Sequence, residues 1–182
     1  MDSKCGPQNT EATLKLAFEY AASQNLTTVV VASTSGETGV TACKLKPDNI
    51  EKLIIVTHNT GFRSHGVQQM APELKKKIQS SGAVIHTGTL VLRGIGSAIR
   101  SRMNYSEEQL IAETLRILGQ GVKVCAEMAA MVSDAGIIGN EDAVFIGGTA
   151  RGVDTAVHIT PAPSNDFFKM RIRKVICKPF TF

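Results

Sequence analysis

A run of hydroxyl side chains and glycines follows the first strongly apolar stretch of the chain. Residues 27–32 are small or β-branched and apolar on both faces, as is typical of a buried parallel strand. The residues that come next are Ser33, Thr34, Ser35, Gly36, Glu37 and Thr38, and residues 40–45 can then open a helix. Helix N-termini favour anions, glycine allows close backbone approach, and hydroxyls donate to phosphate oxygens. We therefore predict a phosphate-binding loop between this strand and its helix.

The alternative for this loop is an ordinary helix cap, in which the hydroxyls bond only to the helix itself. A cap needs one or two hydroxyls, whereas this loop has four in six residues. The G-K-[ST] ending of a Walker loop and the G-x-G-x-x-G run of a dinucleotide fold are both absent. Glu37 would repel a second phosphate, which favours a ligand with one phosphate. An acid in a first helical turn also favours the helix dipole, so this residue has an ordinary structural explanation as well.

Two further loops follow predicted strands and carry residues suited to ligand binding. After the strand at 53–57 the chain offers an aromatic ring and several polar donors in Thr57, His58, Asn59, Gly61 and Phe62. After the strand at 143–146, Thr149 and Arg151 stand among glycines, and an arginine can neutralise a phosphate. The respective alternatives are a surface loop with Phe62 packed inward and a tight turn into the next strand.

Metal, nucleic-acid and membrane-spanning functions are not expected. His58 and His65 have no carboxylate or cysteine at a suitable spacing, and the four cysteines form no C-x-x-C pair. The formal net charge of +4 comes from scattered basic residues in a chain with no Trp and two Tyr, whereas nucleic-acid sites combine clustered cations with aromatic rings. There is no secretory signal and no apolar run of about 18 residues, so we predict a reduced, cytoplasmic protein. Glu127 and Asp134 share one face of a predicted helix, and we interpret them as surface acids.

Apolar strands alternate with amphipathic helices along the chain, which is the pattern of a parallel sheet covered by helices on both faces. The strands are predicted at 27–32, 53–57, 83–85, 143–146 and 154–160, with 170–177 as a candidate edge strand. The helices are predicted at 10–21, 40–45, 67–80, 106–118 and 122–135. Residues 86–102 are predicted to be a loop with irregular helix. The chain then forms one domain, residues 1–182, whose polar loops meet at the carboxyl edge of the sheet.

Residues 29–38 resemble the C-terminal domain of pyruvate kinase, where a strand leads into a [ST]-x-[ST]-G-x-[ST] loop that grips a phosphate of the sugar-bisphosphate effector. Ser33, Ser35, Gly36 and Thr38 occupy the matching positions. The similarity continues through residues 53–57 and 142–161, but the barrel that carries pyruvate kinase chemistry is missing. The chain is also similar to stand-alone microbial proteins that share this domain. The resemblance implies a three-layer α/β/α fold, with a mostly parallel five-stranded sheet and an antiparallel last strand, and flavin mononucleotide (FMN) as ligand.

Three functions stay open on these observations. The first is a binding module that holds a monophosphorylated small molecule, FMN by the resemblance, between the three loops. The second is a flavin-dependent oxidoreductase in which the protein positions the cofactor. The third is a regulatory domain that responds to a phosphorylated metabolite and assembles into a homo-oligomer. We take the first as the main prediction.

Overall fold

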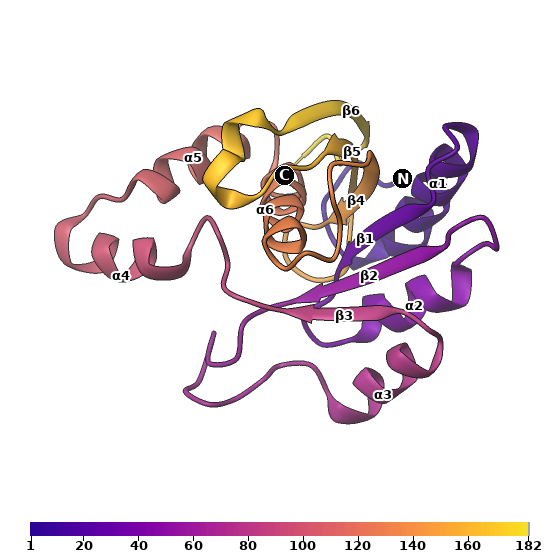
Figure 1. Ribbon diagram of the computed structural model, residues 1–182, viewed down its shortest axis with the longest axis horizontal. Helices are drawn as coiled ribbons and strands as arrows, with labels where there is room; N and C mark the ends of the chain where they lie inside the picture. Colours follow the sequence, from indigo (N-terminus) through magenta and orange to yellow (C-terminus); the bar gives the residue numbers. More distant parts are fainter. Residues whose placement is uncertain (182) are drawn as a thin grey trace.

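A single six-stranded sheet runs through the molecule in this computed structural model, which describes residues 1–181 (Figure 1). The strand order is β3-β2-β1-β4-β5-β6. Strands β1 to β4 are parallel, and β5 and β6 are antiparallel to their neighbours. The strands are β1 (Thr28–Ala32), β2 (Lys52–Thr57), β3 (Val84–Thr87), β4 (Ala143–Gly147), β5 (Thr155–Thr160) and β6 (Arg171–Cys177).

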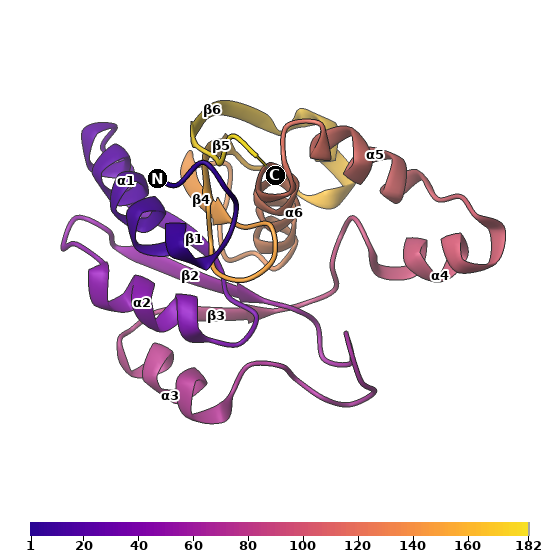
Figure 2. The ribbon, with the colours of Figure 1, turned by 180° about the vertical axis from the view of Figure 1, so that it is seen from behind.

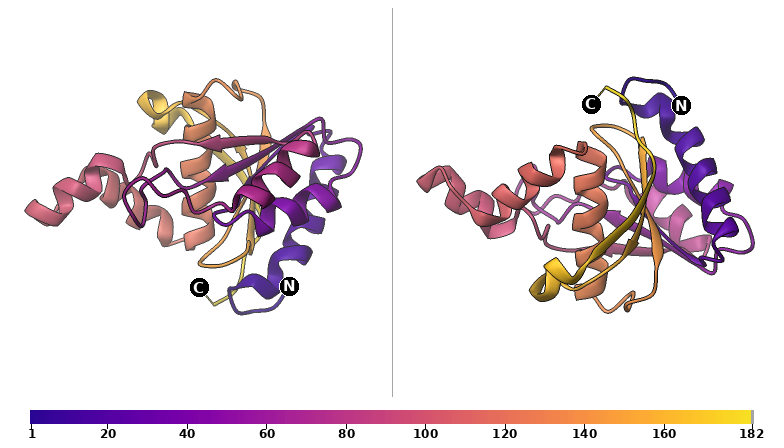
Figure 3. Two further views of the ribbon diagram at one scale, coloured as in Figure 1. Left: turned by 90° about the horizontal axis from the view of Figure 1, so that it is seen from below. Right: turned by 90° about the horizontal axis from the view of Figure 1, so that it is seen from above.

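Helices cover both faces of the sheet. On one face lie α1 (Thr10–Ser23), α2 (Glu37–Leu45) and α3 (Pro72–Ser80), and on the other lies α6 (Gln120–Asp134) (Figures 2 and 3). Helices α4 (Gly94–Met103) and α5 (Glu107–Arg116) extend away from the sheet on the side of α6. Two short 3-10 helices complete the chain, η1 (Pro7–Asn9) before α1 and η2 (Ser164–Lys169) before β6.

Two apolar clusters, one on each face, follow from the alternation of side chains along the strands. In β1, Val29 and Val31 pack with Leu14 and Phe18 of α1, whereas Val30 packs on the opposite face with the α6 side chains. All three valines are fully buried. This explains why the strand is apolar on both faces in the sequence.

The α/β architecture, the helices on both faces and the antiparallel last strand agree with the predictions. The five-stranded sheet implied by the family resemblance is wrong, because β6 pairs with β5 along its length and makes a sixth strand. The candidate edge strand predicted at 170–177 is confirmed as this β6. The predicted helix 67–80 begins only at Pro72, since the residue before a proline is extended, as Ala71 is here. Helix α2 begins earlier than predicted, at Glu37, and residues 86–102 contain the regular helix α4.

The four parallel strands end at one edge of the sheet, and the N-terminus of α6 lies at that same edge. Gly121 is the reason that α6 can sit there, because a Cβ at this position would lie 2.1 Å from Oγ1 of Thr155 at the start of β5. Gly147, at the end of β4, also leaves no room for a side chain, since a Cβ there would lie 2.8 Å from the Gly121 carbonyl oxygen. The close packing brings the first turn of α6 next to the loops that follow β1, β2 and β4.

Within residues 1–181, no helix combines the length and the apolar character that crossing a membrane requires. The cysteines at 5, 43, 125 and 177 are all free thiols.

Candidate functional site

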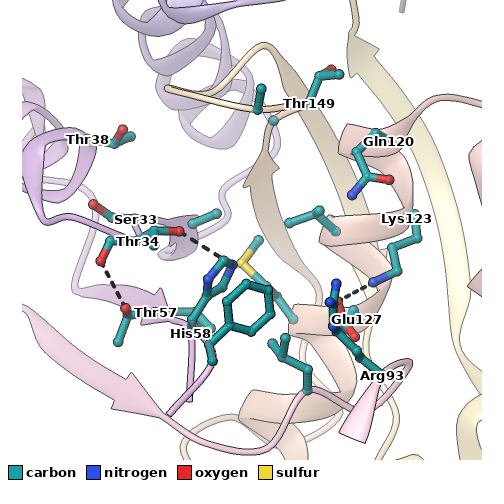
Figure 4. Close-up of a pocket in the computed structure, with 18 of the residues that line it drawn as sticks. Ser33, Thr34, Thr38, Thr57, His58, Arg93, Gln120, Lys123, Glu127 and Thr149 are labelled. Atoms are coloured by element: carbon teal, nitrogen blue, oxygen red, sulfur yellow. Dashed lines mark hydrogen bonds and ion pairs between the residues drawn. The ribbon is translucent and has the colours of Figure 1, made fainter. Parts of the chain in front are cut away.

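A cavity of about 640 Å³ opens at the carboxyl edge of the parallel strands (Figure 4). This volume lies in the range of about 300–1,000 Å³ that is usual for small-molecule sites. Its walls come from the loops after β1, β2 and β4, from the segment between β3 and α4, and from α5 and α6. Polar side chains from these elements face one another across the cavity, with aromatic rings between them.

The first wall is the β1–α2 loop, in which Ser33 is a structural cap. Its Oγ accepts a hydrogen bond from the Gly39 N–H (2.9 Å), and its own N–H donates to the Val56 carbonyl (2.9 Å). The loop turns at Gly36, whose φ of 104° is left-handed. A Cβ on Gly36 would lie 2.8 Å from the Cβ of Leu74, so this residue faces α3 and shapes the loop without lining the cavity.

The start of α2 has unused hydrogen-bonding capacity at the cavity. No hydrogen-bond partner within residues 1–181 takes up the N–H of Glu37 or of Thr38. Ser35 and Thr38 line the same wall, and their hydroxyls have no partner in the described part of the chain. Amides and hydroxyls at a helix N-terminus can bind an anion without a charged side chain, since the helix dipole adds partial positive charge there.

The floor of the cavity is aromatic. The rings of His58 and Phe62 lie 4.0 Å apart between centroids, tilted by 35°, and the guanidinium of Arg93 lies 4.6 Å above the Phe62 ring. Asn59 and Gly61 do not line the cavity. They form the turn that carries Phe62, because the Phe62 N–H donates to the Asn59 carbonyl (3.2 Å) and Gly61 has a φ of 86°.

Hydrogen bonds with two side chains, Gln69 and Thr34, orient the His58 ring. Its Nδ1 lies 3.0 Å from Oε1 of Gln69, which assigns the ring proton to Nδ1 and leaves Nε2 as an acceptor 3.5 Å from the Thr34 hydroxyl. Thr57 donates to the Thr34 carbonyl (3.2 Å) and so ties β2 to the first wall. Burial lowers the pKa of His58, and the charge of Arg93 adds to the decrease against the opposing bond to Gln69. His58 is therefore a neutral ring at physiological pH.

The wall opposite the β1–α2 loop is the first half of α6, and it contains a buried ion pair. Lys123 and Glu127 lie one helical turn apart, with Nζ and Oε2 at 2.5 Å and side chains 6% exposed. The second carboxylate oxygen of Glu127 accepts the Leu92 N–H (2.9 Å). Burial lowers the pKa of Lys123, and the nearby Glu127 carboxylate opposes that decrease. Both side chains line the cavity, so the interpretation of Glu127 as a surface acid is wrong.

Gln120 lies beside this pair at the N-terminus of α6. Nε of Arg116 donates to Oε1 of Gln120 (2.6 Å), while the Arg116 NH1 group contacts Glu113 (2.7 Å). Since the Gln120 oxygen is occupied, its amide N–H group is left to donate into the cavity (Figure 4). Together with Lys123 and Arg93, Gln120 makes this side of the site a set of hydrogen-bond donors.

The β4–β5 loop closes the remaining side with Thr149 and Arg151. Thr149 Oγ1 is buried and has no hydrogen-bond partner in residues 1–181. The loop is held by Asp154, a fully buried carboxylate that accepts the N–H groups of Thr149 (3.3 Å) and Gly6 (3.3 Å) and the hydroxyl of Thr155 (2.8 Å). Asp154 is thus a structural residue that positions the loop.

The charges on the cavity wall favour an anionic ligand. Five cations line it, Arg63, Arg93, Arg116, Lys123 and Arg151, against two carboxylates, Glu37 and Glu127. No group of three or more His, Cys, Asp or Glu residues in the described part of the chain is arranged to hold a metal ion. The site can therefore bind an anion by hydrogen bonds and charge, and a flat ring by stacking.

Most of the residues predicted from the sequence meet at this cavity. Those that line it are Ser33, Thr34, Ser35, Glu37, Thr38, Thr57, His58, Phe62, Thr149 and Arg151. The residues that the sequence interpretation missed are Arg93, Gln109, Arg116, Gln120, Lys123 and Glu127. Lys123 and Glu127 stand four residues apart on a helix with apolar neighbours. This spacing is a sequence signal that could have identified them as an interacting pair. Arg93 precedes α4, Gln109 and Arg116 lie on α5, and Gln120 begins α6, and no local pattern distinguishes them.

No family model matches the chain. Among solved structures, a pyruvate kinase from Cryptosporidium parvum superimposes with a TM-score of 0.36 at 16% sequence identity, over 76% of this chain. The chain spans 20% of the length of that kinase. The likeness is a weak similarity of fold.

Proposed function

We propose that this protein binds a flat heteroaromatic molecule with one phosphate group, and that FMN is the ligand with the best chemical fit. The proposal rests on one observation: a single cavity contains three surfaces that suit the phosphate, the ring and the polar ring edge of such a ligand. Free amides and hydroxyls at the start of α2 suit a phosphate, and the His58–Phe62 pair suits a ring. Gln120, Lys123 and Arg93 supply donors on the far side.

In this assignment the phosphate would lie against the N–H groups of Glu37 and Thr38, with the Thr38 and Ser35 hydroxyls as further donors. Each hydrogen bond to a charged group contributes about 1.5–3 kcal/mol. The carboxylate of Glu37, exposed at the same wall, disfavours a second phosphate nearby. This supports a monophosphate over a sugar bisphosphate.

The donors of α6 fit the polar edge of a flavin ring, which presents carbonyl oxygens. Gln120 would donate through its amide nitrogen, since Arg116 holds its oxygen. Lys123 would donate one of its protons while it remains paired with Glu127. A bound flavin would supply hydride and electron transfer, and the protein would supply binding and orientation.

A comparison of two ligands that differ only in the phosphate tests the proposal. Isothermal titration should show that FMN binds at least about 10-fold more tightly than riboflavin, since one charge-assisted hydrogen bond of about 1.5 kcal/mol corresponds to about that factor. Thr38→Val should weaken the binding of FMN by a similar factor and leave the affinity for riboflavin unchanged. Thr41→Val is the matched control, because Thr41 lies on α2 outside the cavity and bonds to the Glu37 carbonyl (3.1 Å).

Equal affinities for the two flavins, or no effect of Thr38→Val, would show that the β1–α2 loop is not the phosphate site. Binding of neither flavin would exclude FMN. The absorbance spectrum and mass of any molecule that copurifies with the chain provide an independent check.

A flavin-dependent oxidoreductase is the second candidate, favoured by the buried Lys123. A cation beside the polar edge of a flavin stabilises the negative charge of the reduced form, which raises the reduction potential. In the FMN complex, Lys123→Met should therefore lower the midpoint potential. Turnover of a reduced nicotinamide by the wild-type complex would establish the activity, and its absence would leave binding as the function.

A further inference from the structure

Helices α4 and α5 form an arm, residues 94–118, that extends away from the sheet (Figures 1 and 3). Within the arm, α4 packs closely on α5 at Gly96, where a Cβ would lie 2.4 Å from Oε2 of Glu108. Asn104 ends α4 in a left-handed conformation with φ 57°, and Ser106 caps α5 by accepting the Gln109 N–H (3.1 Å). These local signals define the arm as a specific helical hairpin.

Apolar side chains follow one another along one face of α4. On α4, Ile95, Ile99 and Met103 stand four residues apart, and Ile95 and Met103 are 77% and 73% exposed. Leu110 of α5 and Ile117 after it are further exposed apolar side chains of the arm, 59% and 76% exposed. Single exposed apolar residues are ordinary, whereas a contiguous stripe marks an interaction site.

The arm also lacks the packing that would stabilise it alone. Each of its helices has 10 residues. Isolated helices shorter than about 12–15 residues are marginal in water, and helices in proteins are stabilised by burying an apolar face. The exposed face of α4 is therefore expected to be covered by another surface.

Charges on the two helices indicate what covers it. Helix α4 carries Arg100 and Arg102 and no acid, whereas α5 begins with Glu107 and Glu108. No ion pair within residues 1–181 involves Arg100, Arg102 or Glu107. A twofold axis would place the basic α4 of one copy on the acidic α5 of the other, twice in one interface.

We propose that the arm is a self-association surface and that two copies of the chain form a dimer by pairing α4 of each with α5 of the other. The Ile95–Ile99–Met103 stripe lies at the centre of this interface, and Arg100 and Arg102 of one copy pair with the exposed Glu107 of the other across it. Gln109 and Arg116 of α5 line the cavity, so the dimer also holds one wall of that site in place.

Light scattering after size exclusion tests the proposal on the full chain. The wild type should have twice the chain mass of 19.5 kDa, and Ile95→Glu/Met103→Glu should have the mass of one chain. Val67→Glu/Phe180→Glu is the matched control, because it places two acids at exposed apolar positions outside the arm and should remain dimeric. Circular dichroism checks that each variant is folded.

A charge exchange tests the pairing of the helices. Arg100→Glu/Arg102→Glu alone and Glu107→Lys alone should each be monomeric, since like charges then face each other at both contacts. Equimolar mixing of the two variants should restore the dimer mass, because every contact regains opposite charges.

The proposal is overturned by a monomeric wild type at about 100 µM, a concentration far above the micromolar dissociation constants of weak specific interfaces. A dimer that survives both arm variants also overturns it, as does a charge-variant mixture that stays monomeric. Cosedimentation of a monomeric wild type with phosphatidylserine vesicles would assign the arm to a membrane surface instead.

Discussion

The buried Lys123–Glu127 pair offers a quantitative test of the site's structure. The perturbation is Glu127→Gln, which removes the negative charge but keeps an oxygen to accept the Leu92 N–H. Lys123, with a side chain 6% exposed, would then be a buried cation without its partner. Lys123→Met is the complementary single change, and the double variant removes both charges.

The structure sets the size of the effect. Removing one partner of a buried ion pair costs about 3–5 kcal/mol. Lys123 can relieve this by losing its proton, which costs at most about 4.6 kcal/mol at pH 7 for a side chain with an ordinary pKa of about 10.4. The cavity admits water on one side of the pair, which reduces the penalty. We therefore expect Glu127→Gln to lower the free energy of unfolding by about 3 kcal/mol.

The assay is urea denaturation followed by far-ultraviolet circular dichroism, since the chain has no tryptophan. Glu127→Gln should lower the midpoint without changing the slope, because the surface exposed on unfolding is unaltered. The double variant should be within about 1 kcal/mol of the wild type, since replacing both charges removes the desolvation cost together with the attraction. If Lys123→Met costs a similar amount of about 3 kcal/mol, the double-mutant cycle yields a coupling free energy of about 5 kcal/mol.

Two results would refute this reasoning. A loss below about 1 kcal/mol in both single variants would match an exposed pair and would place Lys123 and Glu127 in water. Additive losses in the double variant would show that the two side chains act independently. In either case, the proposed donor role of Lys123 in the cavity would have to be abandoned.

Two further predictions concern the residues that support the site. Because burial lowers the pKa of His58, the unfolded chain takes up this proton first, so the stability contributed by neutral His58 is present above about pH 6.5 and is lost as the pH falls below it. Between about pH 7.5 and 5, the urea midpoint should decline less steeply with falling pH for His58→Gln than for the wild type. Some decline remains in the variant, because burial also lowers the pKa of His86. Equal slopes of midpoint against pH would contradict the prediction. Asp154→Ala leaves three donors around a fully buried position without their acceptor, so it should lower the free energy of unfolding by about 3 kcal/mol. Limited proteolysis should then cut first near residues 148–153, and a variant as resistant as the wild type would contradict the structural role of Asp154.

The amino-acid sequence alone determined the layered α/β fold and the three loops, after β1, β2 and β4, that line one side of the site. The β-branched stretch at β1, apolar on both faces, and the run from Ser33 to Thr38 are local sequence patterns. The carboxyl ends of parallel strands lie at one edge of a sheet whatever the order of the strands. The three predicted loops therefore meet in the structure. The candidate edge strand at 170–177 is confirmed as β6 (Arg171–Cys177), whereas its place beside β5 depends on the tertiary structure.

The opposite wall was decided by tertiary packing. Gly121 and Gly147 allow α6 to approach the sheet so closely that Gln120, Lys123 and Glu127 face the β1–α2 loop. In the sequence, Glu127 is an ordinary helical acid, and its burial beside Lys123 depends on where the whole helix lies. The sequence shows which residues are able to form hydrogen bonds. Their burial and their partners depend on elements that are distant in the chain, so these two properties cannot be read from the local sequence.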